Sequence, residues 1–116
     1  MQKEHKCDCG NKECEARSLM LSENIEYQDG AVVSKTLINK RTGTVTLFAF
    51  DKGQSLSEHT APFDAMVQIL EGESEITVGG HPVSLKAGEF TIMPGGVPHS
   101  VNSITKFKMM LTMIKS

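Results

Sequence analysis

Cysteine is absent from the sequence after residue 14, and this absence excludes a network of disulfide bonds. The three cysteines, Cys7, Cys9 and Cys14, are odd in number and lie close together near the start of the chain, so the rest of the chain has no thiol to pair with. An apolar run of membrane-spanning length is also absent, and the charged first segment lacks the apolar stretch of a secretory signal. We therefore expect a cytoplasmic protein that does not enter a membrane.

A surplus of basic residues is missing too. Lysine and arginine together number 12 and aspartate and glutamate 14, which gives a formal net charge of −2 at pH 7. Proteins that bind nucleic acid usually carry a basic surface, so we expect no nucleic-acid partner. What the sequence does contain is 39% hydrophobic residues in a chain of 116, which is enough for one domain with a core and too little for two.

The first 16 residues differ in composition from the remainder. Residues 1–16 have almost no apolar content and are interpreted as a cysteine-containing tail, whereas residues 17–116 hold the apolar runs of a folded domain. The potential metal ligands of the tail are His5, Cys7, Cys9 and Cys14. Their spacing lacks the paired Cys-x2-Cys that is typical of zinc ribbons, so a reduced tail is the main interpretation and a zinc site the alternative.

Short β-prone runs separated by turn residues follow from residue 31 onward. These runs are AVVSKTLI, TVTLFAF, AMVQIL, SEITV, VSL, FTIM and KFKMMLTMI. Glycine-containing turns lie between them, with a spacing that is typical of a β meander. Only the segment SLMLSENIEY, residues 18–27, has a pattern that could form a turn or two of helix. The sequence thus predicts an all-β protein, an antiparallel sandwich or barrel.

Two of the runs indicate where the core lies. In AMVQIL one face of a strand would carry Ala65, Val67 and Ile69, and the other face Met66, Gln68 and Leu70. Because both faces are largely apolar, the outer one needs a cover, which we expect to be a second copy in a homodimer or, in a monomer, residues 19–30. The last run places Phe107, Met109, Leu111 and Met113 on one face, which we expect to be a core face.

Residues 53–72, GQSLSEHTAPFDAMVQILEG, resemble the first conserved motif of the cupin family. That motif is a glycine, five residues, His-x-His, three or four residues, a glutamate, six residues and a glycine. Gly53, His59 and Gly72 stand at matching positions. The second histidine position is Ala61 and the glutamate position is Ala65.

Residues 88–102, GEFTIMPGGVPHSVN, resemble the second cupin motif. The matching residues are Gly88, Pro94, Gly96 and His99. Both motifs occur in order and at a compatible separation, so the resemblance implies the cupin fold, an antiparallel double-stranded β-helix or jelly-roll barrel, over residues 17–116.

The same resemblance implies a metal site that has lost half of its ligands. Cupins hold their metal by two histidines and a glutamate of the first motif and one histidine of the second, and here only His59 and His99 remain. Residues 59 and 61 would project to the same face of one strand, and a hairpin-related strand would bring His99 alongside. Zinc, nickel, iron, copper and manganese are the divalent metals that we expect, but two imidazoles alone should hold any of them weakly.

Several roles for the two histidines stay open at this point. A third ligand could come from Asp64, which flanks the vacant glutamate position after the strand-interrupting Pro62, or from a cysteine of the tail. Thioethers of Met109 and Met113 would suit Cu(I), although methionines on an apolar face are mostly filler. Otherwise His59 and His99 are structural histidines, or they contact a ligand or transfer a proton directly. His81, in a predicted turn, has no expected role.

Ala61 and Ala65 stand where the family has a histidine and a glutamate, so two polar side chains are missing from the barrel interior. This predicts an apolar pocket whose polar groups are the two remaining histidines. The pocket residues that we expect are His59, Ala61, Phe63, Ala65, Val67, Ile69, His99, Phe107, Met109, Leu111 and Met113. The predicted function is to bind a small organic molecule there, with a weakly held metal at the histidines. The alternative is a metal-dependent cupin enzyme, a dioxygenase, isomerase or lyase, with an unidentified third ligand.

Overall fold

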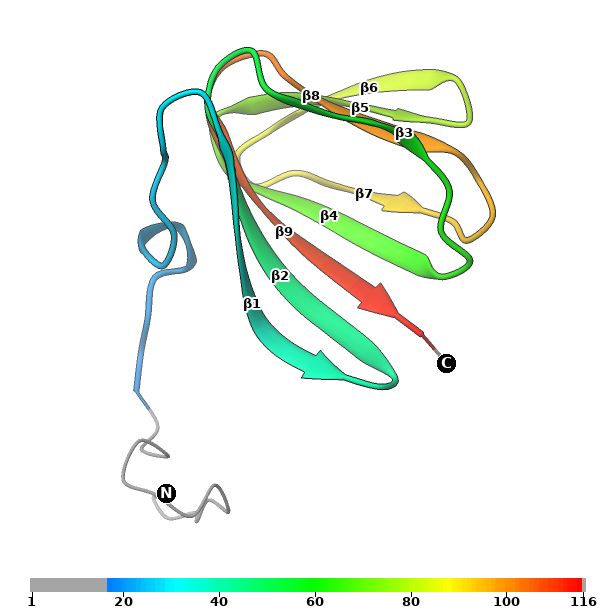
Figure 1. Cartoon of the computed structure of the whole chain (residues 1–116), viewed down its shortest axis with the longest axis horizontal. Helices are drawn as coiled ribbons and strands as arrows, with labels where there is room; N and C mark the ends of the chain where they lie inside the picture. Colours follow the sequence, from blue (N-terminus) through cyan, green and yellow to red (C-terminus); the bar gives the residue numbers. More distant parts are fainter. Residues whose placement is uncertain (1–16, 116) are drawn as a thin grey trace.

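Two antiparallel β-sheets face each other in the computed structural model, which describes residues 17–115 (Figure 1). The strands are β1 (Val32–Lys40), β2 (Gly43–Phe50), β3 (Ser55–His59), β4 (Asp64–Glu71), β5 (Glu73–Val78), β6 (His81–Lys86), β7 (Phe90–Met93), β8 (His99–Ser103) and β9 (Phe107–Ile114). A short 3-10 helix, η2 (Leu21–Glu23), lies within the segment that was expected to form a helical turn. No helix within residues 17–115 is long and apolar enough to cross a membrane. The predicted tail, residues 1–16 with its three cysteines, lies outside the described residues.

The strand order is that of a jelly roll. One sheet has the order β1-β2-β9-β4-β7 and the other β3-β8-β5-β6, with every pairing antiparallel. Consecutive strands are neighbours only in the pairs β1–β2 and β5–β6, so the arrangement differs from the meander that the turn spacing indicated. The predicted all-β jelly-roll barrel is confirmed.

The sheets converge at one end and diverge at the other (Figure 1). At the converging end, called the closed end below, the rings of Phe50 and Phe107 are stacked with centroids 4.5 Å apart. Both side chains are fully buried, so this end is sealed by aromatic packing. The diverging end, called the open end, contains the last residue of β3 and the first residue of β8.

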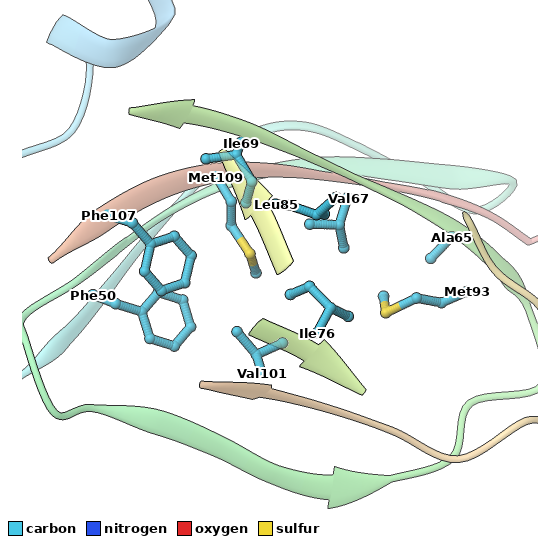
Figure 2. Packing of buried hydrophobic residues seen from close by; sticks show 10 residues of the cluster. All are labelled: Phe50, Ala65, Val67, Ile69, Ile76, Leu85, Met93, Val101, Phe107 and Met109. Carbon is cyan, nitrogen blue, oxygen red and sulfur yellow. The ribbon is translucent and has the colours of Figure 1, made fainter. Parts of the chain in front are cut away.

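The core lies between the sheets and contains the faces that the sequence predicted (Figure 2). Its buried members are Phe50, Ala65, Val67, Ile69, Ile76, Leu85, Met93, Val101, Phe107 and Met109. Along β9, Phe107 and Met109 are fully enclosed, whereas Leu111 and Met113 are half-buried and pack against the cluster from its edge. Packing is thus complete toward the closed end and looser toward the open end.

Residues 19–30 form a strap over the outer face of the five-stranded sheet near the closed end. Ile25 is buried against Leu47 and Ala49, with Leu70 and Met110 packed around it. The Tyr27 hydroxyl donates a hydrogen bond of 2.7 Å to the Glu71 carboxylate, and the Lys108 ammonium donates to the carbonyl of Ser22. The strap is therefore held by apolar contact and by polar contacts at its margin.

The strap leaves the open-end half of the same outer face uncovered. A hollow of about 380 Å³ lies there, lined by Asp64, Ala65, Met66, Ile92, Thr112 and Ile114. Ile92 is 49% exposed and Ile114 53% exposed. The expectation that the outer face of residues 65–70 needs a cover is thus met by residues 19–30 at Leu70 but not at Met66.

Candidate functional site

The two motif histidines meet at the open end. His59 is the last residue of β3 and His99 the first of β8, and their Cα atoms are direct partners across the two strands. The register shifts between Leu56 and His59, so the ladder is irregular immediately before the site. The two Nε2 atoms lie 3.0 Å apart, and the rings meet edge to face at 71° rather than end to end.

Each ring of the pair has its Nδ1 atom beside a backbone carbonyl. His59 Nδ1 lies 3.0 Å from the carbonyl oxygen of Ser57, and His99 Nδ1 lies 3.3 Å from that of Val97. A carbonyl oxygen only accepts, so these two contacts are hydrogen bonds in the tautomer that carries its proton on Nδ1, and a neutral ring in that form presents a bare lone pair at Nε2. Two lone pairs 3.0 Å apart repel each other unless a proton or a metal ion lies between them.

The surroundings of His99 disfavour its protonated form. His99 is only 7% exposed, and burial, followed by the neighbouring His59, lowers the pKa of its imidazole, although the Val97 carbonyl acts in the opposite direction. A buried imidazole that stays neutral is the form that ligates a metal ion. His99 is therefore suited to ligate a metal ion.

The vacated histidine position lies beyond the strand. β3 ends at His59, so residues 59 and 61 do not project from one strand as the motif spacing suggested. β3 and β8 are neighbours through the sheet order and not through a hairpin. Ala61 is half-buried in the connection to β4, and its carbonyl accepts a hydrogen bond of 2.8 Å from the Gly96 backbone. Phe63 is half-buried in the same connection.

The vacated glutamate position faces the core. Ala65 is 5% exposed and pairs across β4 and β7 with Met93, which is 3% exposed. Figure 2 shows the Met93 side chain extending into the interior beside Ala65. Sequence reasoning missed this methionine, which packs next to the position where the family's glutamate would stand.

Four of the expected pocket residues are part of the packed interior. Val67, Ile69, Phe107 and Met109 are 0 to 1% exposed within the core cluster. Leu111 and Met113 are half-buried at its edge, with Met113 paired to Ala65 across β4 and β9. A ligand that enters from the open end would thus meet Ala65 and Met113 first, and only then Val67 and Leu111, which are partners across β4 and β9.

Asp64 is directed away from the histidine pair. Its Oδ1 accepts a hydrogen bond of 2.8 Å from the Gly95 backbone, and the residue contributes to the outer-face hollow. Within residues 17–115 no three side chains of the histidine, cysteine, aspartate and glutamate types come together to hold a metal ion. The described part of the chain thus supplies two metal donors, both imidazole, and fits half of the family's ligand set.

A smaller polar hollow lies beside His99. Its volume is about 80 Å³ and its lining residues are Glu58, Thr77, Gly80, Pro98, His99 and Ser100. His81 is exposed at the start of β6, as expected for a turn residue. Neither feature adds a ligand to the histidine pair, since no described cluster of three metal-ligating side chains forms.

Comparison with known proteins agrees with this fold. The family model described as "Cupin domain" matches residues 46–115. A conserved protein of unknown function from Streptococcus pyogenes is 34% identical, with 87% of this chain and 89% of that chain covered and a TM-score of 0.83. A search of the curated proteins finds no match.

Two further solved structures show the range of similarity. A cupin 2 conserved barrel domain protein from Leptotrichia buccalis is 42% identical over 81% of this chain and 46% of its own, with a TM-score of 0.79. A salicylate 1,2-dioxygenase from Pseudoaminobacter salicylatoxidans is 17% identical over 72% of this chain and 25% of its own, with a TM-score of 0.67, which is a likeness of fold alone. The matched family model covers more than half of the sequence, and this chain belongs to the cupin family.

Proposed function

We propose that this cupin binds a small organic molecule at the open end of its barrel, anchored by His59 and His99. The observation that carries the proposal is the convergence of the two Nε2 atoms at 3.0 Å with both Nδ1 atoms committed to backbone carbonyls. This leaves two Nε2 atoms close together at the end of the barrel where Met113 of the opposite sheet is half-buried. An apolar surface with a few convergent polar groups is what small-molecule sites usually offer.

A weakly held divalent metal ion at the same pair is part of this proposal. Two imidazole nitrogens can each approach one ion at the usual distance of about 2.0–2.1 Å, and neutral imidazole suits zinc, nickel, copper and iron. The two alanines at positions 61 and 65 supply no donor, so water or the organic molecule would fill the remaining positions. A bound ion would polarise an oxygen atom of that molecule as a Lewis acid.

The second candidate is a metal-dependent enzyme. It is favoured by the hydrogen bonds from Nδ1 to a carbonyl, because metal-ligating histidines are usually oriented in this way. A salicylate 1,2-dioxygenase is among the solved structures with this fold, and the likeness at 17% identity concerns the fold alone. The absence of a third donor among residues 17–115 favours binding over catalysis.

The test is the metal and ligand content of protein purified without chelator. Elemental analysis and native mass spectrometry are applied to the wild type, to His59→Ala/His99→Ala and to the control His81→Ala, which removes an exposed histidine. We expect a ligand or a substoichiometric metal that disappears in the double variant and persists in the control. Near-stoichiometric metal together with turnover of a substrate would favour the enzyme, and equal contents in all three proteins would exclude the site.

We also propose that the chain forms a homodimer through the uncovered part of the outer face. The exposed side chains of Ile92 and Ile114 border the hollow beside Met66, and apolar residues of this kind are enriched in the buried centre of dimer interfaces. Light scattering should give the mass of a dimer for the wild type and of a monomer for Ile114→Asp. A monomeric wild type would contradict the proposal.

A further inference from the structure

The two connections that flank the histidines are joined to each other. One is the segment from Ala61 to Asp64, which follows His59, and the other is the turn from Pro94 to Pro98, which precedes His99. The Gly96 amide donates to the Ala61 carbonyl at 2.8 Å, and the Gly95 amide donates to Asp64 Oδ1 at 2.8 Å. Both bonds run from the turn to the segment. They form a clamp that holds the connection before His99 against the connection after His59.

The clamp brings the two backbones into unusually close contact. A side chain at Gly95 would place its Cβ only 2.7 Å from the carbonyl oxygen of Pro62, a separation that real Cβ atoms do not tolerate. Gly95 is therefore needed for the turn to reach the segment. Asp64 supplies the only side chain in these two hydrogen bonds.

The turn contains the group that orients His99. The carbonyl that faces His99 Nδ1 belongs to Val97, two residues after Gly95. A displacement of the turn would move this carbonyl, and the ring would lose the contact that places its proton on Nδ1. The strand ladders place the backbones of the pair, since His99 is the partner of His59 across β3 and β8 and of Val78 across β5 and β8. Val97 lies outside these ladders, in the turn that the two hydrogen bonds hold.

We infer that Asp64 is a positioning residue, whose carboxylate holds the 94–98 turn so that Val97 keeps the Nδ1–H form of His99 and its Nε2 converges on that of His59. The sequence offered Asp64 as a substitute metal ligand. Its carboxylate instead acts on His99 indirectly, through the turn. It accepts a backbone N–H in a charge-assisted hydrogen bond, which is stronger than a neutral one and so can hold the turn in place. The consequence for binding rests on the proposed function, whereas the effect on His99 does not.

The test compares Asp64→Ala with Asp64→Asn, which retains an acceptor oxygen, and with Asp29→Ala, which removes an exposed carboxylate from the strap. Long-range proton–nitrogen NMR of the metal-free proteins, above the ordinary histidine pKa, reports the proton position on each ring. We expect the wild type, Asp64→Asn and Asp29→Ala to keep His99 in the Nδ1–H form, and Asp64→Ala to show a mixture. Asp64→Glu displaces the carboxylate and gives the same comparison should the alanine variant fail to fold.

A titration with Zn(II) alone supplies the second readout. Asp64→Ala should bind zinc at least about tenfold more weakly than Asp64→Asn, the usual cost of removing a group that orients a ligand. An unchanged His99 spectrum in Asp64→Ala, or the same loss in Asp64→Asn, would overturn the inference. If the wild type bound neither zinc nor an organic molecule while Asp64→Ala still altered His99, the positioning role would stand and the proposed function would fall.

Discussion

At the closed end of the barrel both faces of the five-stranded sheet are covered, whereas at the open end both faces are partly bare. Inside the closed end Phe50 stacks on Phe107, and outside it the strap buries Ile25. Inside the open end Met113 is only half-buried, and outside it Ile114 is exposed. Stability is thus concentrated at the closed end, and the open end can carry polar groups that do not stabilise the fold.

The largest effect should follow from opening the closed end. Phe107→Ala removes a fully buried ring and the stacking contact of that ring with Phe50. We therefore expect the free energy of unfolding to fall by about 3–5 kcal/mol. His59→Ala, which removes an exposed ring at the open end, should cost no more than about 0.5 kcal/mol. Urea denaturation measures both. Similar losses in the two variants would remove the distinction between the ends.

A smaller loss should follow from loosening the strap. Ile25 is buried against Leu47 and Ala49, and Ile25→Ala should lower the free energy of unfolding by about 2 kcal/mol, the lower end of the range for such truncations, because the residue packs on one face only. Leu21→Ala in the same strap, at a 37% exposed position, is the matched control with an expected change within about 0.5 kcal/mol. Equal losses would show that Ile25 does not anchor the strap.

The polar margin of the strap should contribute less again. Tyr27→Phe removes the hydrogen bond to Glu71 and should cost about 1 kcal/mol. Burial, followed by the hydrogen bond and the negative charge of Glu71, raises the pKa of Tyr27 well above its ordinary value. Above a pH of about 10 the unfolded chain therefore loses this proton first, and stability falls as the pH rises.

Absorbance of the tyrosinate ion checks this prediction directly, because Tyr27 is the one tyrosine of the sequence. We expect its ionisation to be delayed in the folded protein and to return to the ordinary range in urea. Ionisation at the ordinary pKa in the folded protein would mean that the strap does not hold the hydroxyl against Glu71.

The smallest effect is expected at the open end in acid. The pKa of His99 is lowered mainly by burial and next by His59, so below a pH of about 6.5 the unfolded chain binds a proton that the folded chain resists. This contribution to stability is present above that pH and is lost as the pH falls through it. In metal-free buffer, His99→Asn should flatten the dependence of unfolding on pH between 7 and 5, and His81→Asn should leave it unchanged. An unaltered slope in His99→Asn would contradict the prediction.

Much of the fold could be predicted from the residue pattern. The alternation in AMVQIL correctly assigned Val67 and Ile69 to the core, and the two motifs brought His59 and His99 to one site across strands far apart in the sequence. The pattern could not predict that β3 ends at His59 or that Met93 packs beside Ala65. These depend on which strands become neighbours, and turn spacing alone indicated a meander.

The sequence by itself determined that this chain forms a cupin barrel and that two histidines remain where four ligands would stand, because both follow from residue type and spacing. Only the tertiary structure decided what those histidines present to a ligand. The groups that lie against their Nδ1 atoms are the carbonyls of Ser57 and Val97, and every residue carries a carbonyl, so no side-chain pattern distinguishes these two. The role of Asp64 was likewise decided by the approach of a turn 31 residues away along the chain, since a carboxylate binds whichever donor the fold brings to it.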